Sequence, residues 1–212
     1  MNFDSLEDYI CNHIDEEPEL LRQINREANL KILHGNMLSG HLQGRILKML
    51  TMMVKPTKVL ELGTFVGYST LCFAEGLPEG GEVHTIEVND ELEDLIRYNI
   101  SRSPYRDRVK LYVGDAMDWL DSFEPDTYDL IFIDADKKSY WESYEKSLPL
   151  LKKGGFIIAD NTLWYGKVVE ETKSNDHSTK GILRFNQKLK EDSRVEKVIL
   201  PFRDGLTLIR KL

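Results

Sequence analysis

The sequence predicts an α/β fold, a doubly wound and mostly parallel sheet with an antiparallel strand at its end. Two observations predict this fold class. From Lys58 onward, short and nearly continuous apolar runs alternate with segments of helical periodicity, as expected for parallel strands that helices cover on both faces. Near the C-terminus, Val195–Leu200 and Leu206–Arg210 instead flank the turn-forming residues Arg203-Asp204-Gly205, which predicts a hairpin.

Length and composition limit the class of protein. A chain of 212 residues favours one domain, here a helical segment over residues 1–54 that covers the active site and an α/β core over residues 55–212. The net charge of −8 argues against a protein whose main task is to bind nucleic acid. The two cysteines lack the paired spacing of metal sites, and no apolar run is long enough to cross a membrane. We therefore expect a cytoplasmic protein without membrane contacts.

The N-terminal 54 residues are expected to form helices. Asp4 or Ser5 is the expected cap of the first helix, and Ile32 and Leu33 belong to a second helical run. After an irregular break at residues 34–36, a third helix ends before Pro56. The apolar positions with helical spacing are Leu6, Ile10 and Ile14 in the first helix, and Leu42, Ile46, Leu47 and Leu50 in the third.

The α/β part follows in order. The expected strands before the hairpin are Lys58–Leu62, Glu82–Val88, Val109–Val113, Leu130–Ile133 and Phe156–Ala159. Helical stretches are expected at Ser69–Glu75, Glu91–Ser101, around Trp119 and at Tyr140–Leu151. The polar stretch Trp164–Gly181 is longer than an ordinary connection, so we expect it to be a lid or a specificity loop.

Three successive strand ends point to a ligand that contains a nucleoside, because open parallel sheets bind ligands beyond the carboxyl ends of their strands. Gly63 and Gly67 permit a sharp turn close to a ligand, although their spacing is not that of a dinucleotide loop. Glu87 can accept the two ribose hydroxyls, and Asp115-Ala116 can contact an adenine edge. Turn formation or helix capping explains each residue alone, whereas the three strand ends together favour S-adenosylmethionine.

Two further strand ends carry oxygen ligands. Asp134 follows the fourth strand, and Asp160 and Asn161 follow the fifth. Because one helix connects these strands, a right-handed crossover places them side by side. Two carboxylates and an amide oxygen suit a hard cation, most naturally Mg²⁺ with Mn²⁺ or Ca²⁺ as substitutes, and a cation offsets the cost of neighbouring acids. From the residues alone, Asp136 could take the place of Asp134.

Lys137 follows Asp134 by three residues, and two interpretations of it are open. It is either a solvated lysine like Lys138 or a general base. A nearby cation and the sulfonium of the cofactor would lower the pKa of its ammonium group, while the cation would acidify a coordinated hydroxyl. The expected reaction is an in-line methyl transfer to that oxygen. The five histidines show no metal-ligand spacing, and no serine nucleophile motif is present.

The residues described above resemble the class I S-adenosylmethionine-dependent methyltransferases. More narrowly, they are similar to the metal-dependent O-methyltransferases of the caffeoyl-CoA and catechol type, especially small bacterial members. The resemblance runs from about Asn36 to the terminal hairpin. Its most distinctive segments are Glu61–Ser69, Asp134–Lys137 and Asp160–Trp164.

This resemblance implies a Rossmann-like sheet with strand order 3-2-1-4-5-7-6 and, commonly, a homodimer. It implies that Lys137 is the catalytic base, and that Asp134, rather than Asp136, binds the metal together with Asp160 and Asn161. It also implies a set of cofactor contacts. They are Met37, Ser39, Glu61, Gly63, Ser69, Glu87, Asp115, Ala116 and Asp134.

A metal that chelates the acceptor favours two adjacent oxygens, as in a catechol or a caffeoyl group. The segments expected to face the acceptor are His34–Gly44 and Trp164–Gly181, in which Trp164 and Tyr165 either stack on an aromatic ring or only pack beneath the loop. Some small bacterial relatives methylate 5-hydroxyuridine in tRNA, which offers the same pair of oxygens. A small phenolic acceptor and tRNA are therefore both candidates.

Two groups of basic residues bear on the tRNA alternative, and each is either an RNA-binding patch or an ordinary solvated surface. Two readings from other classes also remain. A nucleotide-dependent oxidoreductase would lack its pyrophosphate loop, and a non-catalytic cofactor-binding module would have no use for the acidic cluster and Lys137. The basic groups are Arg97, Arg102, Arg106, Arg108 and Lys110, and then Lys180, Arg184, Lys188 and Lys190.

Overall fold

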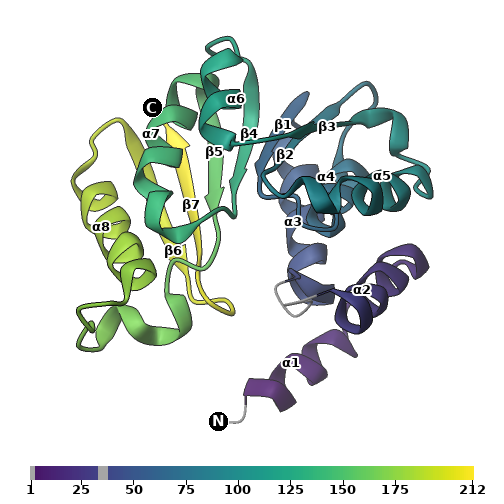
Figure 1. The fold of residues 1–212 in the computed structure, drawn as a ribbon, viewed down its shortest axis with the longest axis horizontal. Coiled ribbons are helices and arrows are strands. Elements are labelled where there is room, and N and C mark those ends of the chain that lie inside the picture. The colour runs from purple at the N-terminus through teal and green to yellow at the C-terminus, as the bar shows by residue number, and fades with distance from the viewer. Residues whose placement is uncertain (1–2, 33–37) are drawn as a thin grey trace.

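A seven-stranded mixed sheet forms the centre of the molecule, with strand order β3-β2-β1-β4-β5-β7-β6 (Figure 1). The structure is a computed structural model and describes residues 3–32 and 38–212. Strands β1 to β5 run parallel, and β7 pairs antiparallel with both β5 and β6. The expected fold class and strand order are therefore confirmed. The strands are β1 (Lys58–Leu62), β2 (Glu82–Glu87), β3 (Val109–Val113), β4 (Tyr128–Ile133), β5 (Leu151–Ala159), β6 (Val195–Leu200) and β7 (Leu206–Lys211).

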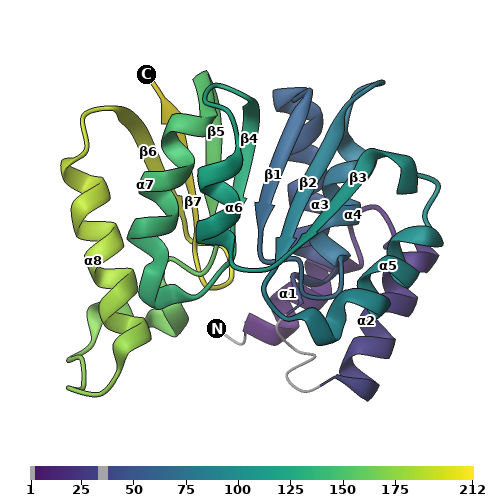
Figure 2. The ribbon, with the colours of Figure 1, turned by 45° about the horizontal axis from the view of Figure 1, so that its top comes forward.

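Helices cover both faces of this sheet (Figure 2). The α-helices are α1 (Phe3–Cys11), α2 (Glu19–Lys31), α3 (Gly40–Val54), α4 (Tyr68–Gly76), α5 (Glu93–Ser101), α6 (Ala116–Ser122), α7 (Tyr140–Leu150) and α8 (His177–Glu191). Short 3₁₀ turns are η2 (Asp90–Leu92), η3 (Arg106–Arg108), η4 (Lys137–Ser139) and η5 (Trp164–Val169). None of these helices is long and apolar enough to cross a membrane, within the described ranges.

The alternation of side chains along β1 separates two hydrophobic cores. Val59 packs with α2, α3, α4 and α5 on one face, whereas Leu60 and Leu62 pack with α6, α7 and α8 on the other. Glu61 shares the face of Val59, which explains why a carboxylate in a central strand reaches Thr70 on α4. Burial on both faces is what the continuous apolar runs predicted.

Helix α8 corrects the expectation of a long loop at Trp164–Gly181. The structure begins that stretch with η5 and starts α8 at His177. The side chain of Asp176 caps the helix by accepting a hydrogen bond from the Thr179 amide at 3.0 Å. Apolar residues buried at helical spacing then hold α8 against the sheet: Ile182, Phe185 and Leu189.

The N-terminal expectations need smaller corrections. Helix α1 begins at Phe3, so Asp4 and Ser5 lie inside the helix rather than before it. Helix α2 ends at Lys31, and Ile32 already has extended backbone angles. Leu33 and the break at residues 34–36 lie outside the described residues. Helix α3, with its apolar stripe, has the expected position and ends before Pro56.

Candidate active site

The carboxyl ends of β1, β2, β4 and β5 open into a cavity of about 450 Å³. Strand β1 lies between β2 and β4, so the strand order reverses here, which is where parallel α/β sheets bind ligands. Helix α3, η4, η5 and the tip of the β6–β7 hairpin complete the walls. Among the lining residues are Leu38, Ser39, Gln43, Gly63, Phe65, Glu87, Val88, Ala116, Asp134, Lys137, Asp160, Asn161, Trp164, Tyr165, Ser178, Arg203 and Asp204.

Gly63 allows β1 and β4 to meet at the floor of the cavity. Its φ is +98°, and a Cβ atom there would lie 2.2 Å from the carbonyl oxygen of Asp134. A side chain is therefore excluded twice, by backbone conformation and by the approach of the neighbouring strand end. The structure thus explains why glycine directly follows β1.

Glu61 lies beneath the cavity rather than in its wall. Its side chain is fully buried and accepts hydrogen bonds from Thr70 and, at 2.6 Å, from the Thr85 hydroxyl. Burial raises the pKa of Glu61 to about 7, although the hydroxyls of Ser69, Thr70 and Thr85 oppose this shift. Its Oε1 is buried without a partner among the described residues. Ser69 is also buried, and its hydroxyl opposes the rise in the pKa of Glu61. It does not line the cavity.

The second and third strand ends differ in what they contribute. Glu87 lines the cavity and accepts hydrogen bonds from the amides of Phe65 at 2.7 Å and Asn89 at 2.9 Å. These bonds fix the carboxylate and leave lone pairs for a ligand. Ala116 lines the cavity, whereas Asp115 is exposed and caps α6 by accepting from the Met117 amide at 2.8 Å. The remaining expected contact, Met37, lies outside the described residues.

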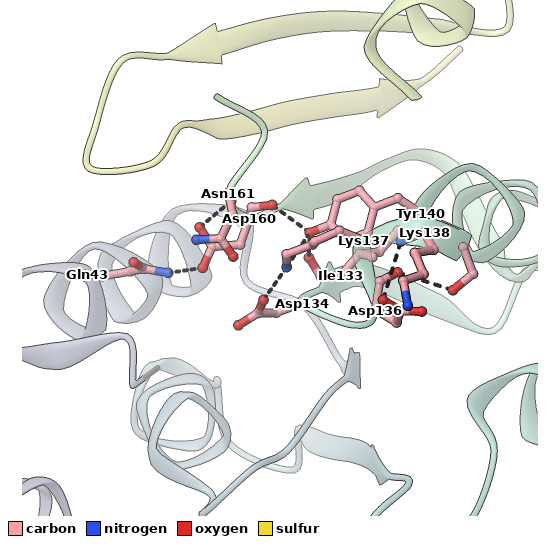
Figure 3. Close-up of polar contacts among 10 residues, drawn as sticks. Gln43, Ile133, Asp134, Asp136, Lys137, Lys138, Tyr140, Asp160 and Asn161 are labelled. Atoms are coloured by element: carbon pink, nitrogen blue, oxygen red, sulfur yellow. Dashed lines mark hydrogen bonds and ion pairs between the residues drawn. The ribbon is translucent and has the colours of Figure 1, made fainter. Parts of the chain in front are cut away.

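The acidic cluster forms where β4 and β5 end side by side (Figure 3). Lys137 on η4 donates from Nζ to Asp134 Oδ1 at 2.7 Å. The backbone turns at Asn161, whose φ is +55°, and its amide donates to Asp160 Oδ1 at 2.7 Å. The Tyr140 hydroxyl lies 2.6 Å from the carbonyl oxygen of Asp160 and anchors this turn to α7. The fold therefore brings four residues expected from the sequence to one site: Asp134, Lys137, Asp160 and Asn161.

Asp160 is held by a residue that the sequence analysis did not identify. Gln43 on α3 is buried and donates from Nε2 to Asp160 Oδ2 at 2.5 Å. Its Oε1 accepts from Nη1 of Arg203 at 3.0 Å, and the same guanidinium contacts the Ser39 carbonyl. Gln43 was visible as a polar residue on the apolar side of α3, four residues before the buried Leu47. Arg203 carried no comparable signal, because hairpin tips are commonly charged.

Charge and burial act in opposite directions on Asp160 and Lys137. Burial and the neighbouring charge of Asp134 raise the pKa of Asp160 to about 6, against the opposing effect of Lys137. Burial alone would lower the pKa of Lys137, but Asp134, Tyr140 and Asp160 raise it above its usual range. The surrounding residues thus favour a charged ammonium, and the lowered pKa expected for a loaded site stays a prediction.

Asp136 has a structural position. It is exposed, although it reaches the cavity rim, and its side chain accepts from the Lys138 amide at the start of η4. In the part of the chain that the structure describes, no three His, Cys, Asp or Glu side chains form a metal-binding group. The candidate cation ligands are accordingly two carboxylates and one amide, Asp134, Asp160 and Asn161.

Comparison with known proteins gives a consistent picture. A family model described as O-methyltransferase matches residues 11–212. Caffeoyl-CoA O-methyltransferase 2 from Populus trichocarpa is 33% identical over 206 residues, covering 92% of this chain and 83% of that protein. Tricin synthase 2 from Oryza sativa subsp. japonica is 34% identical over 221 residues, covering 99% of this chain and 75% of that protein.

Solved structures agree with these relatives. An O-methyltransferase from Bacillus cereus in complex with SAH superposes with a TM-score of 0.88 at 32% identity, covering 98% of this chain and 97% of that one. An O-methyltransferase from Streptomyces achromogenes in complex with SAM gives a TM-score of 0.88 at 26% identity, covering 98% of this chain and 96% of that one.

Proposed function

This chain belongs to the O-methyltransferase family, and we propose that it methylates one of two adjacent oxygens on a small phenolic acceptor in a divalent-metal-dependent reaction. It is an S-adenosylmethionine-dependent O-methyltransferase, in line with the family and its SAM- and SAH-bound structural neighbours. The oxidoreductase and the non-catalytic alternatives are therefore not retained.

The cofactor position that we propose follows the cavity walls. Glu87 and Ala116 would hold the nucleoside at the ends of β2 and β3. Gly63 and Ser39 would face the amino-acid part, with Asp134 at the boundary with the acceptor. Glu61 and Ser69 would support this arrangement from below, through the hydroxyl network that holds the β1 loop.

The observation that carries the metal proposal is the pairing of Asp134 with the buried Asp160 at adjacent strand ends. The pKa of Asp160 is raised first by burial and then by the charge of Asp134, so an ionised Asp160 is incompletely compensated by the surrounding residues. A hard cation held by Asp134, Asp160 and Asn161 would supply that compensation, and the all-oxygen donor set suits Mg²⁺, with Mn²⁺ or Ca²⁺ as substitutes. When bound, the cation supplies a Lewis acid and S-adenosylmethionine supplies the methyl group.

The protein's own part in the reaction is positioning and proton handling. Lys137 lines the cavity, and its Nζ is held by Asp134 at 2.7 Å and lies 3.4 Å from the Tyr140 hydroxyl. We assign the neutral amine of Lys137 as the group that receives the acceptor's hydroxyl proton at Nζ, and the positive charges of a bound cation and of the cofactor's sulfonium would favour that neutral form. The side chain of Gln43 and the backbone amide of Asn161 keep Asp160 in one orientation, which reduces the reorganisation that the reaction requires.

A small aromatic acceptor fits the cavity mouth better than tRNA. Trp164 and Tyr165 line the mouth, and Tyr165 is 71% exposed and accessible for stacking. The first basic group gives tRNA no support, because most of its members are paired with acids: Arg97 with Glu93, Arg102 with Glu27, Arg106 with Asp107, and Lys110 with Glu82. The relatives named for caffeoyl-CoA suggest catechol, caffeate and caffeoyl-CoA as the first acceptors to test.

The decisive experiment measures transfer of a labelled methyl group to these acceptors and to undermodified tRNA, with Mg²⁺ or with EDTA. We expect transfer to a phenol that EDTA abolishes, whereas turnover unaffected by EDTA would remove the metal mechanism. Asp160→Ala should abolish turnover while S-adenosylhomocysteine still binds by calorimetry. Asp134→Asn should weaken Mg²⁺ binding more than Asp136→Asn, which separates the two acids.

Lys137→Ala tests the proton acceptor directly. We expect a loss of rate at neutral pH that becomes smaller at high pH, because an acceptor that has ionised in solution no longer needs a residue to take its proton. A variant as fast as the wild type would reject the assignment. The homodimer stays a prediction, and light scattering on the purified protein tests it.

A further inference from the structure

Tyr140 joins the ends of the two strands that carry the acidic cluster. It is the first residue of α7, and its side chain is fully buried. Its hydroxyl lies 2.6 Å from the carbonyl oxygen of Ile133, the last residue of β4, and 2.6 Å from that of Asp160, directly after β5 (Figure 3). One side chain therefore contacts the backbone immediately before Asp134 and at Asp160 itself.

The core fixes the position of this hydroxyl. The Tyr140 ring packs edge to face against Phe185 of α8, with 5.3 Å between the ring centroids. Just before Tyr140, α8 packs closely on η4, since a Cβ atom on Gly181 would lie 2.1 Å from the Lys137 carbonyl oxygen. Side chains in such close packing keep one rotamer on the time average, so Tyr140 can hold the two strand ends at a fixed separation.

The turn after β5 depends on this contact. The pairing of β4 with β5 ends at the Asp160 amide, which donates to the Ile133 carbonyl at 3.0 Å, and the chain then turns at Asn161, whose φ is +55°. Gln43 holds the carboxylate of Asp160, whereas the Tyr140 hydroxyl holds its backbone carbonyl. The turn carries two of the three candidate cation ligands, so its position relative to β4 sets the geometry of the whole ligand set.

We propose that Tyr140 determines which divalent cation the site prefers, by holding Asp160 and Asn161 in a fixed position relative to Asp134. Mg²⁺ demands near-ideal octahedral ligands at about 2.0–2.1 Å, whereas Ca²⁺ accepts a flexible arrangement at about 2.3–2.6 Å. Rigidly held ligands can meet the strict geometry of Mg²⁺, and loosening them costs Mg²⁺ affinity more than Ca²⁺ affinity. This inference rests on the proposed function, because it needs a cation at these three residues.

The variant Tyr140→Phe tests the proposal, because it removes the hydroxyl and keeps the ring. Tyr144→Phe is the matched control. Tyr144 lies one turn further along α7, is also fully buried and packs on Phe185 at 6.0 Å, but its hydroxyl donates to Asp192 at 2.8 Å and it does not line the cavity. Mg²⁺ and Ca²⁺ are titrated calorimetrically into the wild type and both variants, without acceptor or cofactor.

We expect Tyr140→Phe to weaken Mg²⁺ binding about tenfold and Ca²⁺ binding less than about twofold, and Tyr144→Phe to change neither by more than about twofold. An equal loss for the two cations, or equal effects of the two variants, would overturn the inference. If the wild type binds neither cation, the proposed metal dependence fails together with the inference. If the wild type binds Mg²⁺ and Tyr140→Phe keeps the same ratio of Mg²⁺ to Ca²⁺ affinity, only the inference fails.

Amide hydrogen exchange followed by NMR tests the support of the turn in the metal-free protein. We expect the Asp160 amide to exchange at least about tenfold faster in Tyr140→Phe than in the wild type, and at the wild-type rate in Tyr144→Phe. This readout involves neither cation binding nor catalysis. An unchanged rate in Tyr140→Phe would show that the hydroxyl does not hold the turn, and the inference would be rejected.

Discussion

Replacing Gly63 by alanine tests whether the close approach of β1 and β4 builds the cofactor cavity. Two costs follow from the structure. The φ of +98° places alanine in the left-handed region, at about 1–2 kcal/mol, and its Cβ would lie 2.2 Å from the Asp134 carbonyl oxygen, so that relief of the overlap costs about 1–3 kcal/mol more. The expected destabilisation is therefore about 2–5 kcal/mol.

Gly80→Ala is the matched control, because Gly80 also has a positive φ, +76°, but a Cβ there meets nothing within 4 Å. Thermal unfolding followed by circular dichroism should show a fall in Tm of about 5–15 °C for Gly63→Ala and of a few degrees for Gly80→Ala. Calorimetry should also show at least about tenfold weaker S-adenosylhomocysteine binding for Gly63→Ala only. Equal losses of Tm in the two variants would refute the importance of the strand contact.

Three further predictions concern side-chain networks. Gln43→Leu removes the 2.5 Å hydrogen bond to Asp160, so Mg²⁺ affinity measured by calorimetry should fall about 10–100-fold, and unchanged affinity would contradict the positioning role. Burial raises the pKa of Glu61 to about 7, so the contribution of Glu61 to stability decreases as pH rises from 4.5 toward 7. The variant Glu61→Gln should therefore have a higher Tm than the wild type at pH 8 but not at pH 4. An equal Tm at pH 8 would exclude a costly buried charge. Arg194 lowers the pKa of Asp192 to about 2, so the ionised Asp192 stabilises the fold above pH 3.8, and this stabilisation is lost as pH falls toward 2. The variant Asp192→Asn should lower the free energy of unfolding, measured in urea, by about 2 kcal/mol at pH 7 and by much less at pH 2. An equal loss at both pH values would assign the effect to packing.

The sequence predicted the parallel part of the fold well, because burial on both faces leaves a direct pattern. The runs at β1, β3 and β6 match the observed strands in both bounds. Helix α8 was missed, since the polar N-terminal stretch from Trp164 resembles a loop until the apolar spacing begins at Ile182. The three residues before α8, Ser174, Asn175 and Asp176, all favour turns, so the sequence alone does not show which of them caps the helix. The hydrogen bond from the Thr179 amide to Asp176 in the structure does show it.

The candidate site was predictable where function follows strand ends. A single crossover helix connects β4 and β5, which makes them adjacent strands of the sheet. The proximity of the residues that follow these strands, Asp134, Asp160 and Asn161, could therefore be inferred from the order of elements along the chain. The partners Gln43 and Arg203 come from elements far apart in the sequence, and nothing local indicates that they meet. Asp115 illustrates the reverse case, because capping α6 explains it without a ligand.

The position of β7 also determines when this enzyme can become active during its synthesis. Strand β7 inserts between β5 and β6, and the Arg203 that contacts Gln43 is translated 160 residues after it. Until that hairpin leaves the ribosome, β5 is an open edge carrying the apolar residues Ile157 and Ile158, which makes the nascent chain prone to association with other chains. Closure of this edge and completion of the Gln43–Asp160 contact network therefore both depend on the same C-terminal hairpin.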